Sequence, residues 1–232
     1  MKPRARPCCM QTYFDDELAQ FKEKLLTMGS YAERAVSQAV QSVVERDDQL
    51  ATQVQQDDDL IDQLEVEIDD QAVSLLAKAP LASDLRLITV AMKISQNLER
   101  VGDEATTISR RALELNQEPQ LKSFVDIPRM AGIALGMLKE AMDTFVRKEP
   151  EKARAIVPRD KEVDAINRQL YRELSSRMVE DPTTISRCLN MMTVSKSLER
   201  VADHAANIAE EVVYLCEARD IRHEINRAAV DS

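Results

Sequence analysis

The stretch Leu98-Glu99-Arg100-Val101-Gly102-Asp103 returns 100 positions later as Leu198-Glu199-Arg200-Val201-Ala202-Asp203. In each copy, one carboxylate is followed four residues later by another. Residues i and i+4 are neighbours on one face of an α-helix, so the two acidic side chains of each copy would project together. Two like charges so placed weaken an isolated helix by roughly 0.2–0.5 kcal/mol. A cost repeated at matched places indicates a positive group nearby: an arginine, a partner protein or a metal ion.

The composition favours an all-helical protein with a packed core. The chain has 232 residues, of which 44% are apolar and 31% charged, with only four glycines and no tryptophan. Alanine, leucine, glutamate, arginine and glutamine are plentiful, and all five are good helix formers. A fold built from long helices is therefore the first expectation.

The net charge of −10 bears on the kinds of partner. An acidic chain lacks the basic surface that neutralises nucleic-acid phosphates, and it is poorly suited to an anionic membrane surface. The longest apolar run falls well short of the 18–20 residues or so of a membrane span, and no apolar stretch follows the basic residues at the N-terminus. We therefore expect a cytoplasmic protein with no direct membrane insertion and no nucleic-acid partner.

Apolar residues at alternating spacings of three and four predict six long helices. The first starts near Thr12 and ends near residue 46, the second stops before Pro80, and the third starts at a short turn with Ser83 as its candidate N-cap. The fourth spans about 128–147, the fifth ends at Asp181, and the sixth begins at Pro182. The predicted buried stripes of the second, third and sixth helices are as follows: Leu60, Ile61, Leu64, Ile68, Leu75 and Leu76; Leu87, Ala91, Ile94, Leu98, Val101, Ala105, Ile108 and Ala112; Met191, Val194, Leu198, Val201, Ala205, Ile208, Val212 and Leu215.

The second half of the chain repeats the first. Asp58-x-x-Ile61-Asp62 aligns with Asp160-x-x-Val163-Asp164, and Pro80 aligns with Pro182, at the same offset of 102. This predicts two tandem three-helix bundles related by internal duplication. We place the bundles at residues 12–119 and 124–218, with a disordered leader at 1–11 and a polar tail at 219–232.

Four pairs of acidic residues separated by one helical turn recur in this repeat. If the second and third helix of each bundle are neighbours, the acids of both helices could converge on a shared ion. Oxygen-only ligand sets suit Mg²⁺, Mn²⁺, Ca²⁺ or iron. The alternative is a solvated helix face whose acids pair with arginines such as Arg100 and Arg200. The four pairs are Asp58/Asp62, Glu99/Asp103, Asp160/Asp164 and Glu199/Asp203.

Catalytic constellations have little support. The chain has two histidines, His204 and His223, and the residues three positions after Glu99 and Glu199 are Gly102 and Ala202. The Glu-x-x-His pairs of ferritin-like di-iron enzymes are therefore missing. No glycine-rich phosphate loop is present. We expect no catalytic residues, and we interpret His204 as a surface histidine rather than a metal ligand.

Together with the turn Pro80-Leu81-Ala82-Ser83-Asp84-Leu85-Arg86, the doubled acidic motif resembles the signatures of the PhoU family. The resemblance covers about residues 12–217. It implies a cytoplasmic, non-catalytic, usually homodimeric protein of two helical bundles. Such a protein is a negative regulator of the phosphate-starvation response, linking the ATPase subunit of the phosphate ABC transporter to a sensor histidine kinase.

The resemblance also implies metal binding through acidic motifs on the bundle surface. The implied metals are iron, zinc, manganese or magnesium, and all four acid pairs match the motif. Asn207 fits a common continuation of the second copy, whereas Thr107 stands at the equivalent place in the first. We therefore predict the more complete metal site in the second half.

Two other hypotheses stay open at this point. The carboxylates could serve a metal-dependent enzyme or a metal store, which metal-dependent turnover would reveal. The chain could also be a helical scaffold that holds no ion.

Overall fold

The computed structural model describes residues 8–121 and 126–221, with side chains from Tyr13 onward. Within these ranges the chain forms α-helices and two short 3₁₀ turns, with no strand, which confirms the all-helical prediction. No helix among the described residues is long and apolar enough to cross a membrane. The elements are α1 (Cys8–Glu45), α2 (Asp48–Leu76), α3 (Ala82–Asn116), α4 (Asp126–Arg147), α5 (Pro150–Ile156), η1 (Val157–Arg159), α6 (Asp160–Glu180), η2 (Pro182–Thr184) and α7 (Ile185–Glu217).

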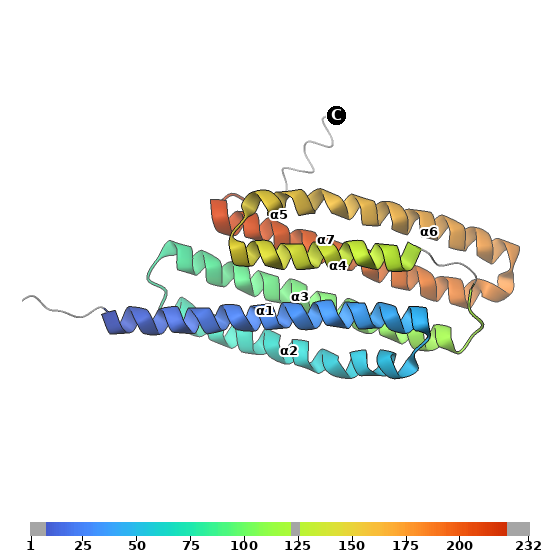
Figure 1. Cartoon of the computed structure of the whole chain (residues 1–232), viewed down its shortest axis with the longest axis horizontal. Helices are drawn as coiled ribbons and strands as arrows, with labels where there is room; N and C mark the ends of the chain where they lie inside the picture. The colour runs from blue at the N-terminus through green and yellow to red at the C-terminus, as the bar shows by residue number, and fades with distance from the viewer. Residues whose placement is uncertain (1–7, 122–125, 222–232) are drawn as a thin grey trace, which may run out of the picture.

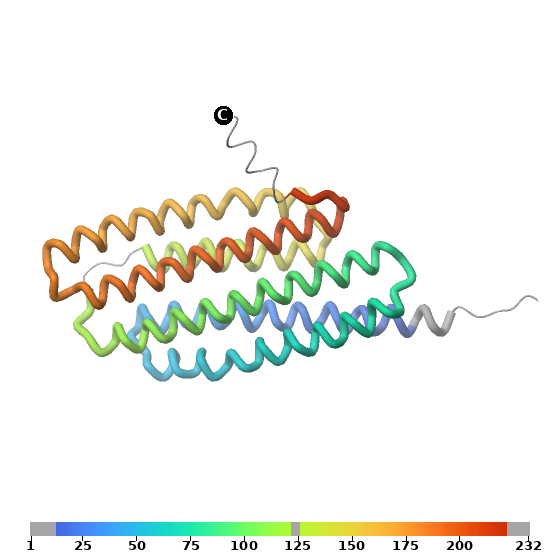
Figure 2. Tube along the Cα trace, turned by 180° about the vertical axis from the view of Figure 1, so that it is seen from behind, coloured from blue at the N-terminus to red at the C-terminus, as the bar shows by residue number. Residues whose placement is uncertain are grey.

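Two bundles lie side by side along their long axes (Figure 1). The first consists of α1, α2 and α3, and the second is built on α4, α6 and α7. Helices α3 and α7 pack against each other along the middle of the molecule, and α1 also contacts α4. Seen from behind, α3 and α7 run next to each other, with α2 and α6 along the two outer edges (Figure 2). The duplicated three-helix architecture is thus confirmed.

The α3–α7 contact is antiparallel and centred on the doubled motif. Along it, Lys93 pairs with Glu211 at 3.1 Å and the Glu104 carboxylate pairs with Arg200 at 3.0 Å. Further along, Arg111 approaches Asn190. Residue numbers rise along α3 as they fall along α7, so the two copies of the motif meet near the middle of both helices. We call this contact the seam.

The predicted apolar stripes form the core. Leu98 and Leu198, the leucines of the two motif copies, are both fully buried. The stripe of α3 is buried from Leu87 to Ala112, as is that of α7 from Met191 to Leu215. Leu60 is an exception: its side chain is 42% exposed, so the prediction that it joins the stripe of α2 was wrong. The neighbouring Ile61, predicted for the same stripe, is buried.

Three local predictions were wrong. Helix α1 already begins at Cys8 rather than near Thr12, because no glycine or proline interrupts the chain between these residues; the rest of the predicted leader lies outside the described residues. An unpredicted short helix, α5, begins at Pro150, since proline is favoured in a first helical turn as well as after a last one. The N-cap of α3 is Leu81 rather than Ser83, and no side chain caps this helix.

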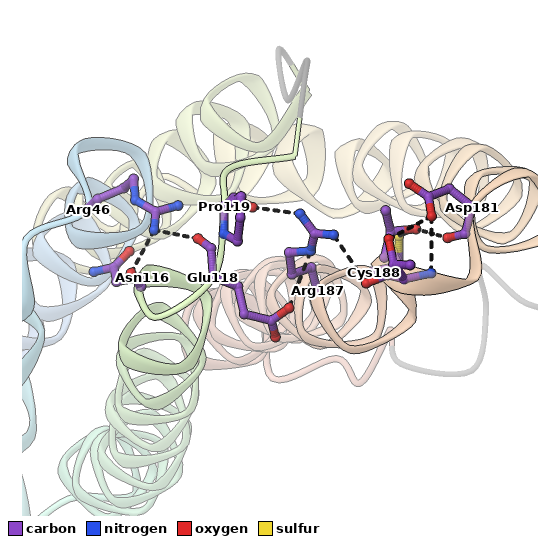
Figure 3. Close-up of polar contacts among 9 residues, drawn as sticks. Arg46, Asn116, Glu118, Pro119, Asp181, Arg187 and Cys188 are labelled. Carbon is purple, nitrogen blue, oxygen red and sulfur yellow. Dashed lines mark hydrogen bonds and ion pairs between the residues drawn. The ribbon is translucent and has the colours of Figure 1, made fainter.

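Two arginines hold the C-terminal end of α3 between the halves (Figure 3). Arg46, just after α1, donates to the carbonyl oxygens of Asn116 at 2.7 Å and Glu118 at 2.6 Å. Arg187, at the start of α7, donates to the carbonyl oxygen of Pro119 at 2.8 Å. Positive charge is favourable at the C-terminal end of a helix, which is the negative end of its dipole. These contacts therefore stabilise the end of α3 and the start of the connection to α4.

Candidate functional site

The first acidic cluster lies where α2 crosses α3, and consists of Asp58, Asp62, Glu99 and Asp103. The close approach of the two helices depends on Gly102: a Cβ at this position would lie 3.0 Å from the Cδ1 of Ile61 and 3.1 Å from an oxygen of Asp58. The predicted neighbourhood of the second and third helices is therefore confirmed. Because Gly102 lies one residue before Asp103, this crossing brings acids of both helices to one place.

Electrostatics show that these acids interact. Burial raises the pKa of Glu99 to about 7, and the charges of Asp103, Glu65 and Asp62 act in the same direction. Burial also raises the pKa of Asp58, and Asp62 and Asp103 add to the rise. A carboxylate whose pKa is raised by burial and by like charges is a candidate functional group.

Arg100 is the counter-charge of this cluster. Its guanidinium lies 3.3 Å from Glu99 and 3.5 Å from Asp103, and its side chain is largely exposed. The arginine pairing weighed from the sequence therefore occurs in the first half. It leaves the pKa of Glu99 raised all the same, because the burial of Glu99 and its acidic neighbours outweigh the lowering by Arg100.

The second acidic cluster joins α6 to α7 and consists of Asp160, Asp164, Glu199 and Asp203. Burial, followed by the charges of Glu199 and Asp164, raises the pKa of Asp203 to about 6. Burial also raises the pKa of Asp160, whose Oδ1 accepts no hydrogen bond from the described residues. Glu199 forms an ion pair with Lys196 on its own helix.

The two clusters differ in their arginine: Arg100 pairs with the acids of its own cluster, whereas its counterpart does not. Arg200, the counterpart of Arg100, turns away from its own cluster and pairs across the seam with the buried Glu104. His204 is half-buried in the seam, with Nδ1 2.9 Å from the Oδ1 of Asn97. The interpretation of His204 as a surface histidine was wrong, since the sequence did not reveal which helices of the two bundles meet. Burial lowers the pKa of His204.

Asn207, predicted to extend the second cluster, contacts α3. Its amide nitrogen lies 3.4 Å from the Oδ1 of Asn97, the same acceptor that faces His204. In this arrangement Asn207 belongs to the seam.

Sequence reasoning missed Glu65. Its pKa is raised by burial and by Asp69 and Asp62, and its charge contributes to the raised pKa of Glu99. The signal was present, because Glu65 follows Asp62 by three residues and so lies on the same helix face. At the offset of 102 its counterpart is Asn167, which is buried and accepts a hydrogen bond from Ser195 at 2.6 Å. The first half therefore carries the larger group of acids.

The donor chemistry of both clusters suits hard cations such as Mg²⁺ and Mn²⁺, since every side chain supplies carboxylate oxygen. Across residues 13–121 and 126–221, no three His, Cys, Asp or Glu side chains are grouped closely enough to hold one ion as they stand. Binding would therefore require side-chain rotation, with Arg100 and Lys196 releasing Glu99 and Glu199. A bound cation would stabilise the charged forms of Glu99 and Asp203, whose pKa values are raised, and would give the Oδ1 of Asp160 a partner.

The raised pKa of Glu99 predicts a pH dependence of stability in metal-free protein. The folded state holds this proton up to about pH 7, whereas an unfolded glutamate releases it near its ordinary pKa. Stability should therefore fall as the pH rises between these values. Replacing Glu99 by glutamine should raise the free energy of unfolding by about 1 kcal/mol at pH 7.5, after allowance for solvent screening, and change it little at pH 4.

Urea unfolding of wild type and Glu99→Gln, after chelation, measures this difference at both pH values. Glu23 on α1 is exposed and far from both clusters, so Glu23→Gln serves as the control. An equal effect of Glu99→Gln at pH 4 and pH 7.5 would contradict the prediction.

Comparison with known proteins identifies relatives of the whole chain. The family model for the PhoU domain matches twice, at residues 25–112 and 127–212, once in each half. A phosphate-specific transport system accessory protein PhoU homolog of Pseudomonas aeruginosa is 42% identical over 212 residues, covering 90% of this chain and 88% of that protein. A protein of the same description from Rhizobium meliloti is 38% identical, covering 87% and 86%.

Solved structures show the same fold. The crystal structure of PhoU from Pseudomonas aeruginosa superimposes with a TM-score of 0.86 at 41% identity, covering 89% of this chain and all of that one. The phosphate transport system regulatory protein PhoU from Streptococcus pneumoniae gives a TM-score of 0.84 at 29% identity, covering 89% and 98%. The similarity thus extends over both bundles.

Proposed function

The chain belongs to the PhoU family, and on that premise we propose that it is a negative regulator of the phosphate-starvation response. The observation that carries the proposal is the double match of the PhoU domain, once over each half of the duplicated chain. Relatives are named accessory or regulatory proteins of phosphate transport. We propose that this chain likewise acts in phosphate transport, without catalysis.

Its proposed partners are two proteins of the phosphate system. The regulator would link the ATPase subunit of the phosphate ABC transporter to the sensor histidine kinase, and keep the kinase quiet when phosphate is abundant. Two similar bundles packed against each other along α3 and α7 suit such an adaptor, since they present two related surfaces. We propose that it works in the cytoplasm as a homodimer.

The acidic clusters would hold the metal ions of this regulator. In the first half Asp58, Asp62, Glu99 and Asp103 would supply the ligands, with Glu65 close by. In the second half the ligands would be Asp160, Asp164, Glu199 and Asp203. Iron, zinc, manganese or magnesium would screen the mutual repulsion of these carboxylates and fix each outer helix on its central one.

Deletion of the gene tests the regulatory proposal. In high phosphate, an alkaline phosphatase reporter should be derepressed by the deletion, and a plasmid copy of the wild-type gene should restore repression. The reason is that the kinase would lose the protein that keeps it inactive. A reporter that stays repressed in the deletion strain, under the same phosphate supply, would overturn the proposal.

A further inference from the structure

A cleft of about 520 Å³ opens between the two halves, at the end of α3 opposite to Arg46. Its walls come from four elements that Figure 1 shows gathered at one end of the molecule. They are α1, the first turns of α3, the turn between α4 and α5, and the last turn of α7. The acidic clusters lie elsewhere, and the turn Pro80–Arg86 that the sequence singled out belongs to this cleft. The polar residues of the lining are Lys22, Ser83, Asp84, Arg86, Lys148 and Glu217.

The cleft carries more positive than negative charge. Lys22, Arg86 and Lys148 all line this cleft, and none of the three forms an ion pair with a described residue. Of the two carboxylates, Glu217 is held by Arg154 in an ion pair. Asp84 is left to balance the three cations, with some help from Asp15, whose charge also reaches Lys22.

The cationic groups come close enough to repel one another. Burial lowers the pKa of Lys22, and the positive charge of Lys148 lowers it further. Arg86 lies over the ring of Tyr214, with its guanidinium carbon 5.9 Å from the ring centroid, a contact that orients it and leaves its N–H groups available. An anion in the cleft would relieve the repulsion between the two lysines.

Lys148 makes none of the backbone contacts that its counterpart Arg46 makes at the other end of the molecule. Arg46 and Lys148 occupy equivalent places after the first helix of each half, both with left-handed backbone, φ 59° and 55°. Arg46 donates to two carbonyl oxygens at the end of α3 (Figure 3). The Lys148 side chain forms no hydrogen bond or ion pair within the described ranges, although a left-handed conformation costs energy for a lysine. Its ammonium group is available to a ligand.

The start of α3 adds to the positive potential. The N-cap of this 35-residue helix is Leu81, whose apolar side chain makes no capping hydrogen bond, and Asp84 is the acidic residue of the first turn. A helix N-terminus carries about half a positive charge. The hydroxyl of Ser83 lines the cleft at the same place and can donate.

We propose that this cleft binds one phosphate group, with inorganic phosphate as the ligand. Lys22, Lys148 and Arg86 would bind its oxygens by charge-assisted hydrogen bonds. Asp84 would make the cleft prefer phosphate over sulfate, because a carboxylate accepts a hydrogen bond from the P–OH of hydrogen phosphate and repels the fully deprotonated sulfate. That phosphate is the oxyanion in question rests on the proposed function. Bound there, it would contact both halves of the regulator.

Titration calorimetry of the full-length protein with sodium phosphate, with and without prior chelation, tests the proposal. One phosphate should bind per chain in both preparations, and sodium sulfate should bind about tenfold more weakly or not at all. Lys148→Gln and Arg86→Gln should each weaken phosphate binding about tenfold or more. Lys139→Gln removes the same charge from an exposed position of α4 away from the cleft, and should leave binding unchanged.

Three results would overturn the proposal: absence of phosphate binding in wild type, binding that chelation abolishes, or equal binding by Lys148→Gln and wild type with the fold intact by circular dichroism. The second result would place phosphate on a metal ion. Asp84→Asn should reduce the preference for phosphate over sulfate, and an unchanged preference would remove Asp84 from the site. The gene-deletion test is separate, since repression by a protein that binds no phosphate would overturn this inference and leave the regulatory proposal standing.

Discussion

Replacing Leu98 by alanine is expected to lower the free energy of unfolding by about 2–5 kcal/mol. Leu98 opens the first copy of the doubled motif, and its side chain is fully buried in the core that α3 shares with its neighbours. Removing it loses the transfer free energy of the side chain and leaves a cavity that rigid helices close only in part. Chemical denaturation followed by circular dichroism measures the change.

Leu60 on α2 is the matched control, because its side chain is 42% exposed. Leu60→Ala should cost less than about 1 kcal/mol. Leu198 is equally buried in the second copy. Leu198→Ala should therefore lower the free energy of unfolding by about as much as Leu98→Ala. Similar losses for Leu60→Ala and Leu98→Ala would contradict the assignment of the stripe to the core.

The fold could be predicted because its main signals are periodic and occur twice. The apolar residues from Leu87 to Ala112 lie on one face of their helix. The corresponding residues of the second half lie on the same face relative to their copy of the motif. The alignment of Pro80 with Pro182 marked where each central helix begins. Local exceptions such as α5 were missed because proline both ends and starts helices, and the sequence alone does not say which.

The candidate site could be predicted in part. The acids of α2 and α3 interact as their spacing indicated, since helices adjacent in sequence with a short connection pack as neighbours. What lies in the seam could not be predicted. Asn97 with His204, and Glu104 with Arg200, are separated by about 100 residues and depend on how one bundle docks on the other. The cleft with Lys148 requires four segments at once, which no local pattern indicates.

Loss of the acidic clusters is expected to abolish metal binding. Replacing Glu99 and Asp103, and likewise Glu199 and Asp203, by their amides removes two charged ligands from each cluster. We expect each double variant to lose at least about 100-fold in metal affinity at its own cluster, because affinity for hard cations depends on the number of charged oxygen ligands. The fold should persist, since the same changes also remove repulsion between like charges.

The most direct measurement is a titration of chelated wild type, both double variants and the quadruple variant with Mn²⁺, followed by elemental analysis. The matched control replaces two exposed acids outside the clusters, Asp59 by asparagine and Glu162 by glutamine. We predict that wild type and control bind metal alike, that each double variant loses the sites of one half, and that the quadruple variant binds none. Wild type without bound metal at about 1 mM Mn²⁺, or a quadruple variant that binds as wild type does, would contradict the account.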